Sequence, residues 1–175
     1  MIKTILVPTD GSDHANKAIE LAADIGAKYK AKIVLLHVLL HNMSVYELKS
    51  MGERLKAPAA VLDELDQVGE AMVDASATGY GGPVYLPAPR DALKAIGDLI
   101  LANAKQRAES LDVASVETKV AEESPADAIL RVADDVSADM IVMGSRGLGK
   151  VADMLMGSVS HKVSHLSKCT CVTVK

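Results

Sequence analysis

A glycine-rich segment near the C-terminus carries the residue types and spacing that could do chemistry. The segment from Gly144 to Lys150 (GSRGLGK) directly follows an apolar run from Asp139 to Met143. Glycines at the carboxyl end of a strand allow backbone N–H groups to approach a phosphate closely. The segment therefore favours a phosphate-binding loop; the alternative is a loop that only reverses the chain.

Two common nucleotide motifs fit this segment incompletely. The P-loop pattern GxxxxGK[ST] matches Gly144 to Lys150, but Val151 stands where a hydroxyl should bind Mg²⁺. The dinucleotide pattern GxGxxG/A matches Gly147, Gly149 and Ala152, but no acidic residue follows about 20 positions later to hold a ribose. Neither motif is favoured.

A third pattern spans more of the chain. Gly144, Gly147, Gly157 and Ser158 form G-x2-G-x9-G-S, which resembles the ATP-binding signature of the universal stress protein family. The similarity extends to the N-terminal segment ILVPTDGSDHANKAIELA and to the strand IVLLHV. In all, it covers about residues 1–40 and 91–175. One departure is Glu122-Glu123 shortly before Pro125, where family members commonly have a glycine.

The resemblance implies an adenine nucleotide site holding ATP, ADP or AMP, with or without Mg²⁺. Asp10 would accept hydrogen bonds from ribose hydroxyls, its alternative role being a helix cap, and Val38 would meet adenine, its alternative role being plain core. The helix beginning at Gly157 would favour a phosphate through its dipole. The implied site comprises Pro8, Thr9, Asp10, Val38, Met143, Gly144, Arg146, Gly147, Gly149, Gly157, Ser158, Val159 and Ser160.

Strands alternate with helices along the chain, which predicts parallel pairing through right-handed crossovers. The predicted strands are residues 2–7, 32–40, 116–121, 139–143 and 170–174, and the predicted helices follow Gly11 and Ser124 or span 91–111 and 157–166. The resemblance implies a single doubly wound α/β domain with a five-stranded parallel sheet in the order 3-2-1-4-5, an adenine nucleotide alpha hydrolase-like fold. In that order the first and fourth strands meet at the switch point where ligands bind.

The segment of about 42–90 is expected to be an insertion in a domain that spans residues 1–175. Apolar residues at helical spacing predict two short amphipathic helices, from Val45 to Leu55 and from Val61 to Met72. A Gly/Pro-rich stretch, ATGYGGPVYLPAP, follows them. Because the insertion leaves the carboxyl end of the second strand, we expect it beside the nucleotide.

Composition excludes several classes of protein. Hydrophobic residues make up 49% of the chain, with no Trp or Phe, so the core must be aliphatic. The net charge of −4 and the lack of a Lys/Arg run argue against nucleic-acid binding. No apolar run reaches the roughly 18–20 residues that span a membrane, and no signal peptide is evident, so a cytoplasmic protein is expected. His161/His165 and Cys169/Cys171 lack further ligands nearby, and no metal site is expected.

The sequence offers no nucleophile–base pair and no residue placed to activate water. Of the roles that the resemblance implies, we therefore favour a nucleotide-dependent regulatory or stress-response protein over an enzyme. The alternatives are a slow ATPase or nucleotide-handling enzyme, or an ATP-independent dimeric adaptor. A homodimer is expected through Thr170–Val174, because this apolar edge strand lies between Lys168 and Lys175 and contains no charge of its own.

Overall fold

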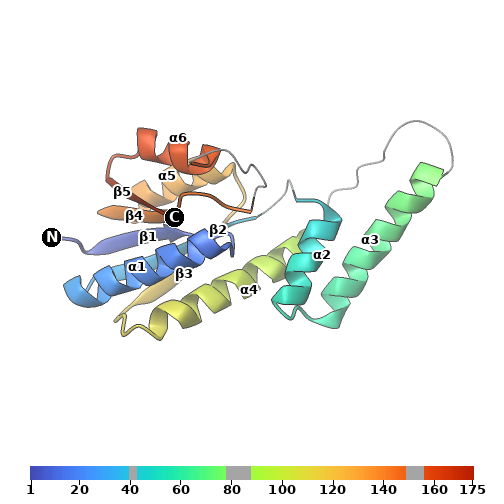
Figure 1. The fold of residues 1–175 in the computed structure, drawn as a ribbon, viewed down its shortest axis with the longest axis horizontal. Helices are drawn as coiled ribbons and strands as arrows, with labels where there is room; N and C mark the ends of the chain where they lie inside the picture. Colours follow the sequence, from blue (N-terminus) through green and yellow to red (C-terminus); the bar gives the residue numbers. More distant parts are fainter. Residues whose placement is uncertain (40–42, 78–87, 149–155) are drawn as a thin grey trace. The chain divides into compact units, whose positions relative to one another are not determined.

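The computed structural model describes residues 1–39, 43–77, 88–148 and 156–175 (Figure 1). The chain divides into two compact units, one formed by residues 1–38 and 100–175 and the other by residues 39–99. Each unit is described by itself below.

The first unit contains one parallel sheet. Its strands are β1 (Thr4–Pro8), β2 (Lys32–Val38), β3 (Val116–Ala121), β4 (Met140–Gly144) and β5 (Thr170–Val174). The spatial order is β3-β2-β1-β4-β5, as predicted. β1 and β4 are neighbours, with Ile5 opposite Met140 and Leu6 opposite Ile141.

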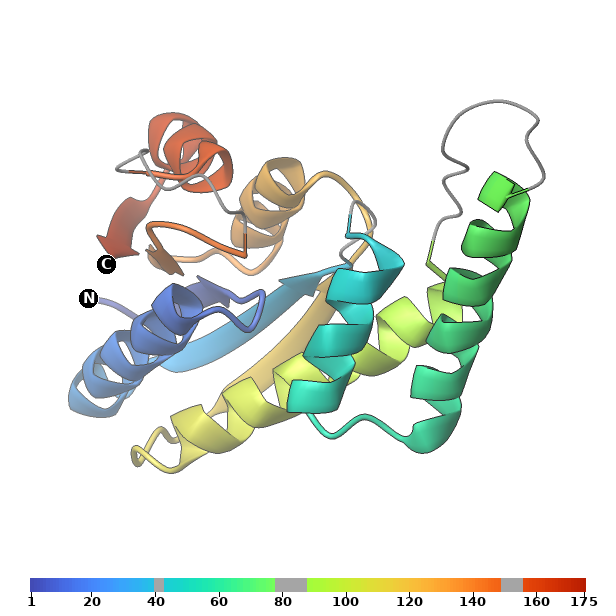
Figure 2. The ribbon, with the colours of Figure 1, turned by 45° about the vertical axis from the view of Figure 1, so that its right-hand side comes forward.

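Helices cover both faces of this sheet because successive strand residues point to opposite sides (Figures 1 and 2). Ile5 and Val7 belong to a core cluster with α1 (Asp13–Tyr29) and the second half of α4 (Arg90–Glu109). Leu6 lies in the opposite cluster, with α5 (Pro125–Asp135) and α6 (Ser158–Leu166). Both clusters are aliphatic, so the fold is doubly wound around a core without Trp or Phe.

The helix predicted over 91–111 is observed as α4, Arg90–Glu109. Its expected apolar stripe, Leu93, Ile96, Ile100 and Ala104, is buried throughout. Among the described residues, no helix has the length and apolar character needed to cross a membrane.

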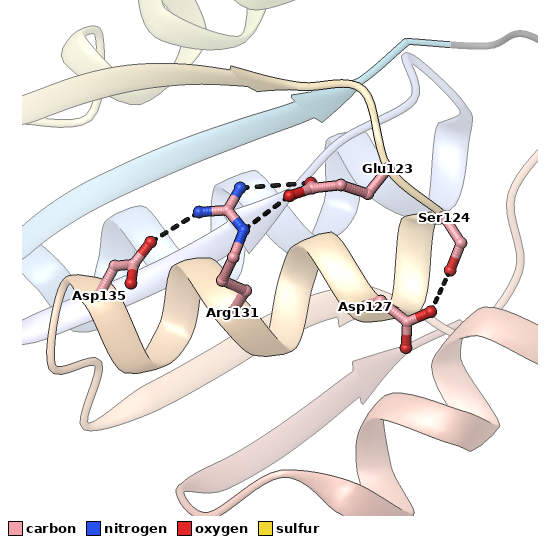
Figure 3. Close-up of polar contacts among 5 residues, drawn as sticks. All are labelled: Glu123, Ser124, Asp127, Arg131 and Asp135. Atoms are coloured by element: carbon pink, nitrogen blue, oxygen red, sulfur yellow. Dashed lines mark hydrogen bonds and ion pairs between the residues drawn. The ribbon is translucent and has the colours of Figure 1, made fainter.

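The starts of α1 and α5 differ in how serine caps them. Ser12 Oγ accepts a hydrogen bond from the Ala15 N–H at 3.3 Å, a regular N-cap. Ser124 stands at the N-cap of α5 before Pro125, as predicted, but makes no side-chain bond to the backbone. Its hydroxyl instead donates to Asp127 Oδ2 at 2.6 Å (Figure 3). The hydroxyl proton thus goes to an ionised carboxylate, which accepts stronger hydrogen bonds than a neutral group does.

The second unit contains α2 (Val45–Arg54), α3 (Ala59–Ala77) and the first turns of α4. α2 and α3 lie side by side in both views (Figures 1 and 2). A capping box of Ser44 and Glu47 begins α2. Both helices expected in the insertion are present, although α3 has 19 residues and is not short. The expected Gly/Pro-rich stretch lies largely outside the described residues, and the placement of the insertion beside a nucleotide stays a prediction.

Candidate functional site

The carboxyl ends of β1 and β4 bring together segments that are far apart in the sequence. The Leu148 N–H donates to Asp10 Oδ2 at 3.0 Å, across 138 positions. The contact lies where the strand order reverses, which is the usual ligand crevice of open α/β sheets. The predicted proximity of Asp10 and the glycine loop is therefore observed.

Asp10 links three parts of this edge. Its Oδ1 accepts the Ser12 N–H at 3.0 Å, at the start of α1, while Oδ2 accepts the Leu148 N–H of the glycine loop. The alternative role of Asp10 as the cap of α1 is filled by Ser12. A carboxylate has about four acceptor positions, so two remain on Asp10 after these bonds.

Close approach explains glycine at two positions of the loop. A Cβ atom at Gly147 would overlap the Asp10 carboxylate. At Gly144 it would lie 2.8 Å from His14 Cβ and 2.9 Å from the Arg146 carbonyl oxygen. The loop can therefore pack this closely against β1 and α1 only because residues 144 and 147 are glycines without a Cβ atom.

The start of α6 is fastened to the start of the loop. The Gly157 N–H donates to the Ser145 carbonyl oxygen at 2.8 Å. Ser160 Oγ donates to the same oxygen at 2.8 Å and lies 3.0 Å from the Gly157 carbonyl oxygen. The Ser160 hydroxyl thus bonds within the protein. Ser158 and Val159 occupy the first turn of α6, and the backbone N–H groups of this turn have no acceptor within the helix.

Two histidines that sequence reasoning did not place in the site, His14 and His37, contribute to this edge. His14 Nδ1 and Ser145 Oγ form a hydrogen bond of 3.1 Å between α1 and the loop. His37, 1% exposed, donates through Nδ1 to the Thr9 carbonyl oxygen at 2.9 Å. Neither residue has a spacing signal, because His14 lies in a helical pattern and His37 in a buried strand.

The other expected site residues differ in how far they are buried. Thr9, Val38 and Met143 are 5%, 8% and 3% exposed, and the side chains of Val38 and Met143 belong to the core beneath α5 and α6. The core role of Val38 is therefore observed, and a ligand there would meet mainly backbone. Pro8 ends β1, and Arg146 is partly exposed with no ion pair within the described ranges. Gly149 lies outside the described residues.

Comparison with known proteins places this geometry in context. A model of the universal stress protein family matches residues 1–175. Universal stress protein YxiE of Bacillus subtilis is 32% identical over the whole length of both chains. A crystal structure of a universal stress protein in complex with cAMP covers 99% of this chain and 96% of its own, at 24% identity and a TM-score of 0.59. The universal stress protein from Archaeoglobus fulgidus in complex with dAMP covers 100% of this chain and 98% of its own, at 16% identity and a TM-score of 0.60.

Proposed function

Because the chain belongs to the universal stress protein family, we propose that it is a nucleotide-dependent stress-response protein that binds ATP, ADP or AMP at this edge. The observation that carries the proposal is the contact of Asp10 with the loop N–H of Leu148. This contact places a carboxylate, which can accept hydrogen bonds from ribose hydroxyls, beside backbone N–H groups that can bind a phosphate. Two structures of similar fold hold cAMP and dAMP, both adenine nucleotides.

The charges at this edge suggest which part of the nucleotide binds to which residues. The two free acceptor positions of Asp10 suit two ribose hydroxyls, while a triphosphate would be repelled by the same carboxylate. The phosphates go to the N–H groups of Ser158 and Val159, where the dipole of α6 favours an anion. Arg146, which has no ion pair among the described residues, adds positive charge on the loop.

A Mg²⁺ ion would bind at this site together with the nucleotide, through its phosphate oxygens. No group of three His, Cys, Asp or Glu side chains within the described ranges is arranged to hold a metal. Mg²⁺ commonly rests on phosphate oxygens with one or two carboxylates. Asp10 would be the carboxylate available here, and the ion would neutralise phosphate charge.

Slow ATP hydrolysis is the second candidate function. His14 and Ser145, 3.1 Å apart, have the spacing of a base and a nucleophile. Ser145 is 2% exposed, however, so its hydroxyl is better suited to holding the loop against α1. We therefore favour nucleotide binding and signalling over hydrolysis. An ATP-independent dimeric adaptor is the least favoured function, because the loop retains the glycines that a phosphate site needs.

Native mass spectrometry of the purified protein, followed by titration with labelled ATP, tests the proposal. Gly157→Val should weaken ATP affinity at least about tenfold, because the side chain occupies the phosphate position and the lost charge-assisted hydrogen bonds are worth about 1.5–3 kcal/mol each. A Cβ at Gly157 meets only ordinary contacts, 3.5 Å from the Ser145 carbonyl oxygen at the nearest, so the variant should fold.

Ser124→Val is the matched control, because it puts the same side chain at the N-cap of α5. Its ATP affinity should equal that of the parent. If Gly157→Val binds ATP as tightly as Ser124→Val does, the nucleotide site lies elsewhere.

A further inference from the structure

A pocket between α2 and α3 lies entirely within the second unit and is independent of the nucleotide proposal. It has a volume of about 310 Å³. Tyr46 and Lys49 line it from α2, and Asp66, Gly69 and Glu70 line it from α3. A pocket of this size accepts one large side chain or a small ligand.

Two of the residues that line the pocket are buried, whereas its aromatic residue is exposed to solvent. Val45 and Leu65, which also line it, are 3% and 1% exposed and belong to the packed core of the two helices. Tyr46 is 61% exposed, although most of an aromatic side chain is usually buried. The ring therefore presents surface that the chain itself does not use.

Gly69 is unexplained by the packing of the helices. It stands inside α3, where glycine is less favourable than alanine because it loses more backbone freedom on folding. A Cβ there would meet only the Tyr46 ring, at an ordinary 3.9 Å. At Gly52 of α2, by contrast, a Cβ would lie 3.0 Å from Leu62 Cδ2. The space for a side chain is thus tight at position 52 but not at 69, where the effect of glycine is to widen the pocket.

The charges around the pocket are mainly negative. Lys49 pairs with Asp66 and lies 3.9 Å from Glu53 Oε1. Its pKa is raised, first by the hydrogen bond with Asp66 and further by the charges of Asp66, Glu53 and Asp63. Glu70 has no ion pair among the described residues, and α3 contains five Asp or Glu residues and no Lys or Arg. One lining carboxylate is therefore left for a cation from outside.

We propose that this pocket binds an arginine side chain from a basic segment of a partner protein. The guanidinium stacks on the Tyr46 ring and pairs with the Glu70 carboxylate. Its aliphatic stem lies over Gly69, where no side chain obstructs it. Arginine fits better than lysine because a planar guanidinium both stacks on an aromatic face and pairs with a carboxylate.

A fluorescein-labelled peptide with a central arginine between leucines, flanked by lysines, is the probe. Fluorescence anisotropy with the full-length protein should show saturable binding. Replacing the central arginine by citrulline, which keeps the shape and removes the charge, should weaken it about fivefold or more. Equal binding of the two peptides would overturn the proposal.

Two charge variants separate the pocket from the overall charge of the protein. Glu70→Gln should weaken binding of the arginine peptide about fivefold, the effect of one lost ion pair. Glu64→Gln removes the same charge from the same helix outside the pocket lining, and should leave binding unchanged. Equal losses in both variants would reduce the effect to net charge and overturn the proposal.

Variants of Gly69 test the shape argument. Gly69→Leu fills the pocket and should abolish peptide binding, whereas Gly69→Ala should raise the midpoint of urea unfolding. A lower midpoint for Gly69→Ala would mean that packing requires the glycine, and would overturn the argument. A change in sedimentation of the protein alone on Tyr46→Ala would assign the pocket to a second copy of the chain, also against the proposal.

Discussion

Gly147 and Gly157 belong to the same loop motif but differ in their surroundings. A Cβ at Gly147 overlaps the Asp10 carboxylate, whereas at Gly157 it finds only ordinary contacts. The fold itself therefore needs the first glycine, through the Asp10–Leu148 hydrogen bond, and leaves the second free for a ligand.

Gly147→Ala should lower the free energy of unfolding by about 1 kcal/mol, because the Leu148 N–H must move away from Asp10. Gly157→Ala is the matched control and should stay within about 0.5 kcal/mol of the parent. Urea unfolding followed by circular dichroism measures both. A Gly147→Ala protein as stable as Gly157→Ala would contradict the close approach to Asp10.

Sequence reasoning predicted this site unevenly. The family resemblance carried by the spacing of Gly144, Gly147 and Gly157, with the strand order that it implies, predicted that Asp10 meets the loop. The roles of His14 and His37 were not predictable, because a hydrogen bond to a distant backbone or hydroxyl leaves no periodic pattern. The expected place of Ser160 beside a phosphate stays a prediction; in the structure its hydroxyl lies within hydrogen-bond distance of the Ser145 and Gly157 carbonyl oxygens.

A network of charged side chains fastens α5 to the end of β3 (Figure 3). Arg131 Nε donates to Glu123 Oε1 at 2.7 Å and its Nη1 to Asp135 Oδ2 at 2.7 Å. The hydrogen bond from Arg131 lowers the pKa of Glu123. Lys162 and then Ser124 lower the pKa of Asp127 in the same way.

These lowered pKa values predict a stability that falls in acid. The unfolded chain binds protons to Glu123 and Asp127 at higher pH than the folded chain does, so folding is favoured above their ordinary pKa values and less so below about pH 4. Arg131→Met should flatten the dependence of the unfolding midpoint on pH between about pH 3 and 5.

Lys105→Met is the control for this variant, because it removes one positive charge and an exposed pair with Glu109 at 3.7 Å. Its pH dependence should match that of the parent when urea unfolding is measured across the same range. Identical slopes for Arg131→Met and the parent would show that the network does not contribute.

At the level of elements, the sequence pattern predicted the helices of both units, and the family resemblance predicted the sheet order. Unbroken apolar runs indicated buried strands, and the alternation of strands and helices indicated crossovers. The length of α3 was underestimated because its last turns, up to Ala77, carry small residues without a strong apolar stripe. The hydrogen bond from the Ser124 hydroxyl to Asp127 was missed because it depends on the geometry of the two side chains.

For the molecule as a whole, the two edges of the sheet differ in their protection against another chain. β3 carries Glu117 and Lys119, with Glu117 paired to Lys32, and charges on an edge strand oppose pairing. β5, Thr170–Val174, has no charged residue. The β5 edge is therefore the one expected to pair in a homodimer.

Val172→Lys should shift the protein towards monomer, because a charge would be buried in the pairing of two β5 strands across a two-fold axis. Sedimentation velocity at tens of micromolar measures this, and the unfolding midpoint checks that the variant folds, since Val172 also packs on the core. A parent protein that sediments as a monomer would refute the dimer.

The buried face of α1 has a consequence for how the protein tolerates mutation. Ala15, Ala18, Ala22 and Ala23 are all at most 3% exposed, and Ile19 is the one large side chain among the buried residues of this helix, so most of its contact with the core is made by small side chains. Trimming these residues removes little, while any enlargement must push the helix, and with it the His14 support of the loop, away from β4. In a saturation library, the selection at these four positions should follow residue size more than hydrophobicity, with valine and leucine rejected as firmly as polar residues of the same bulk.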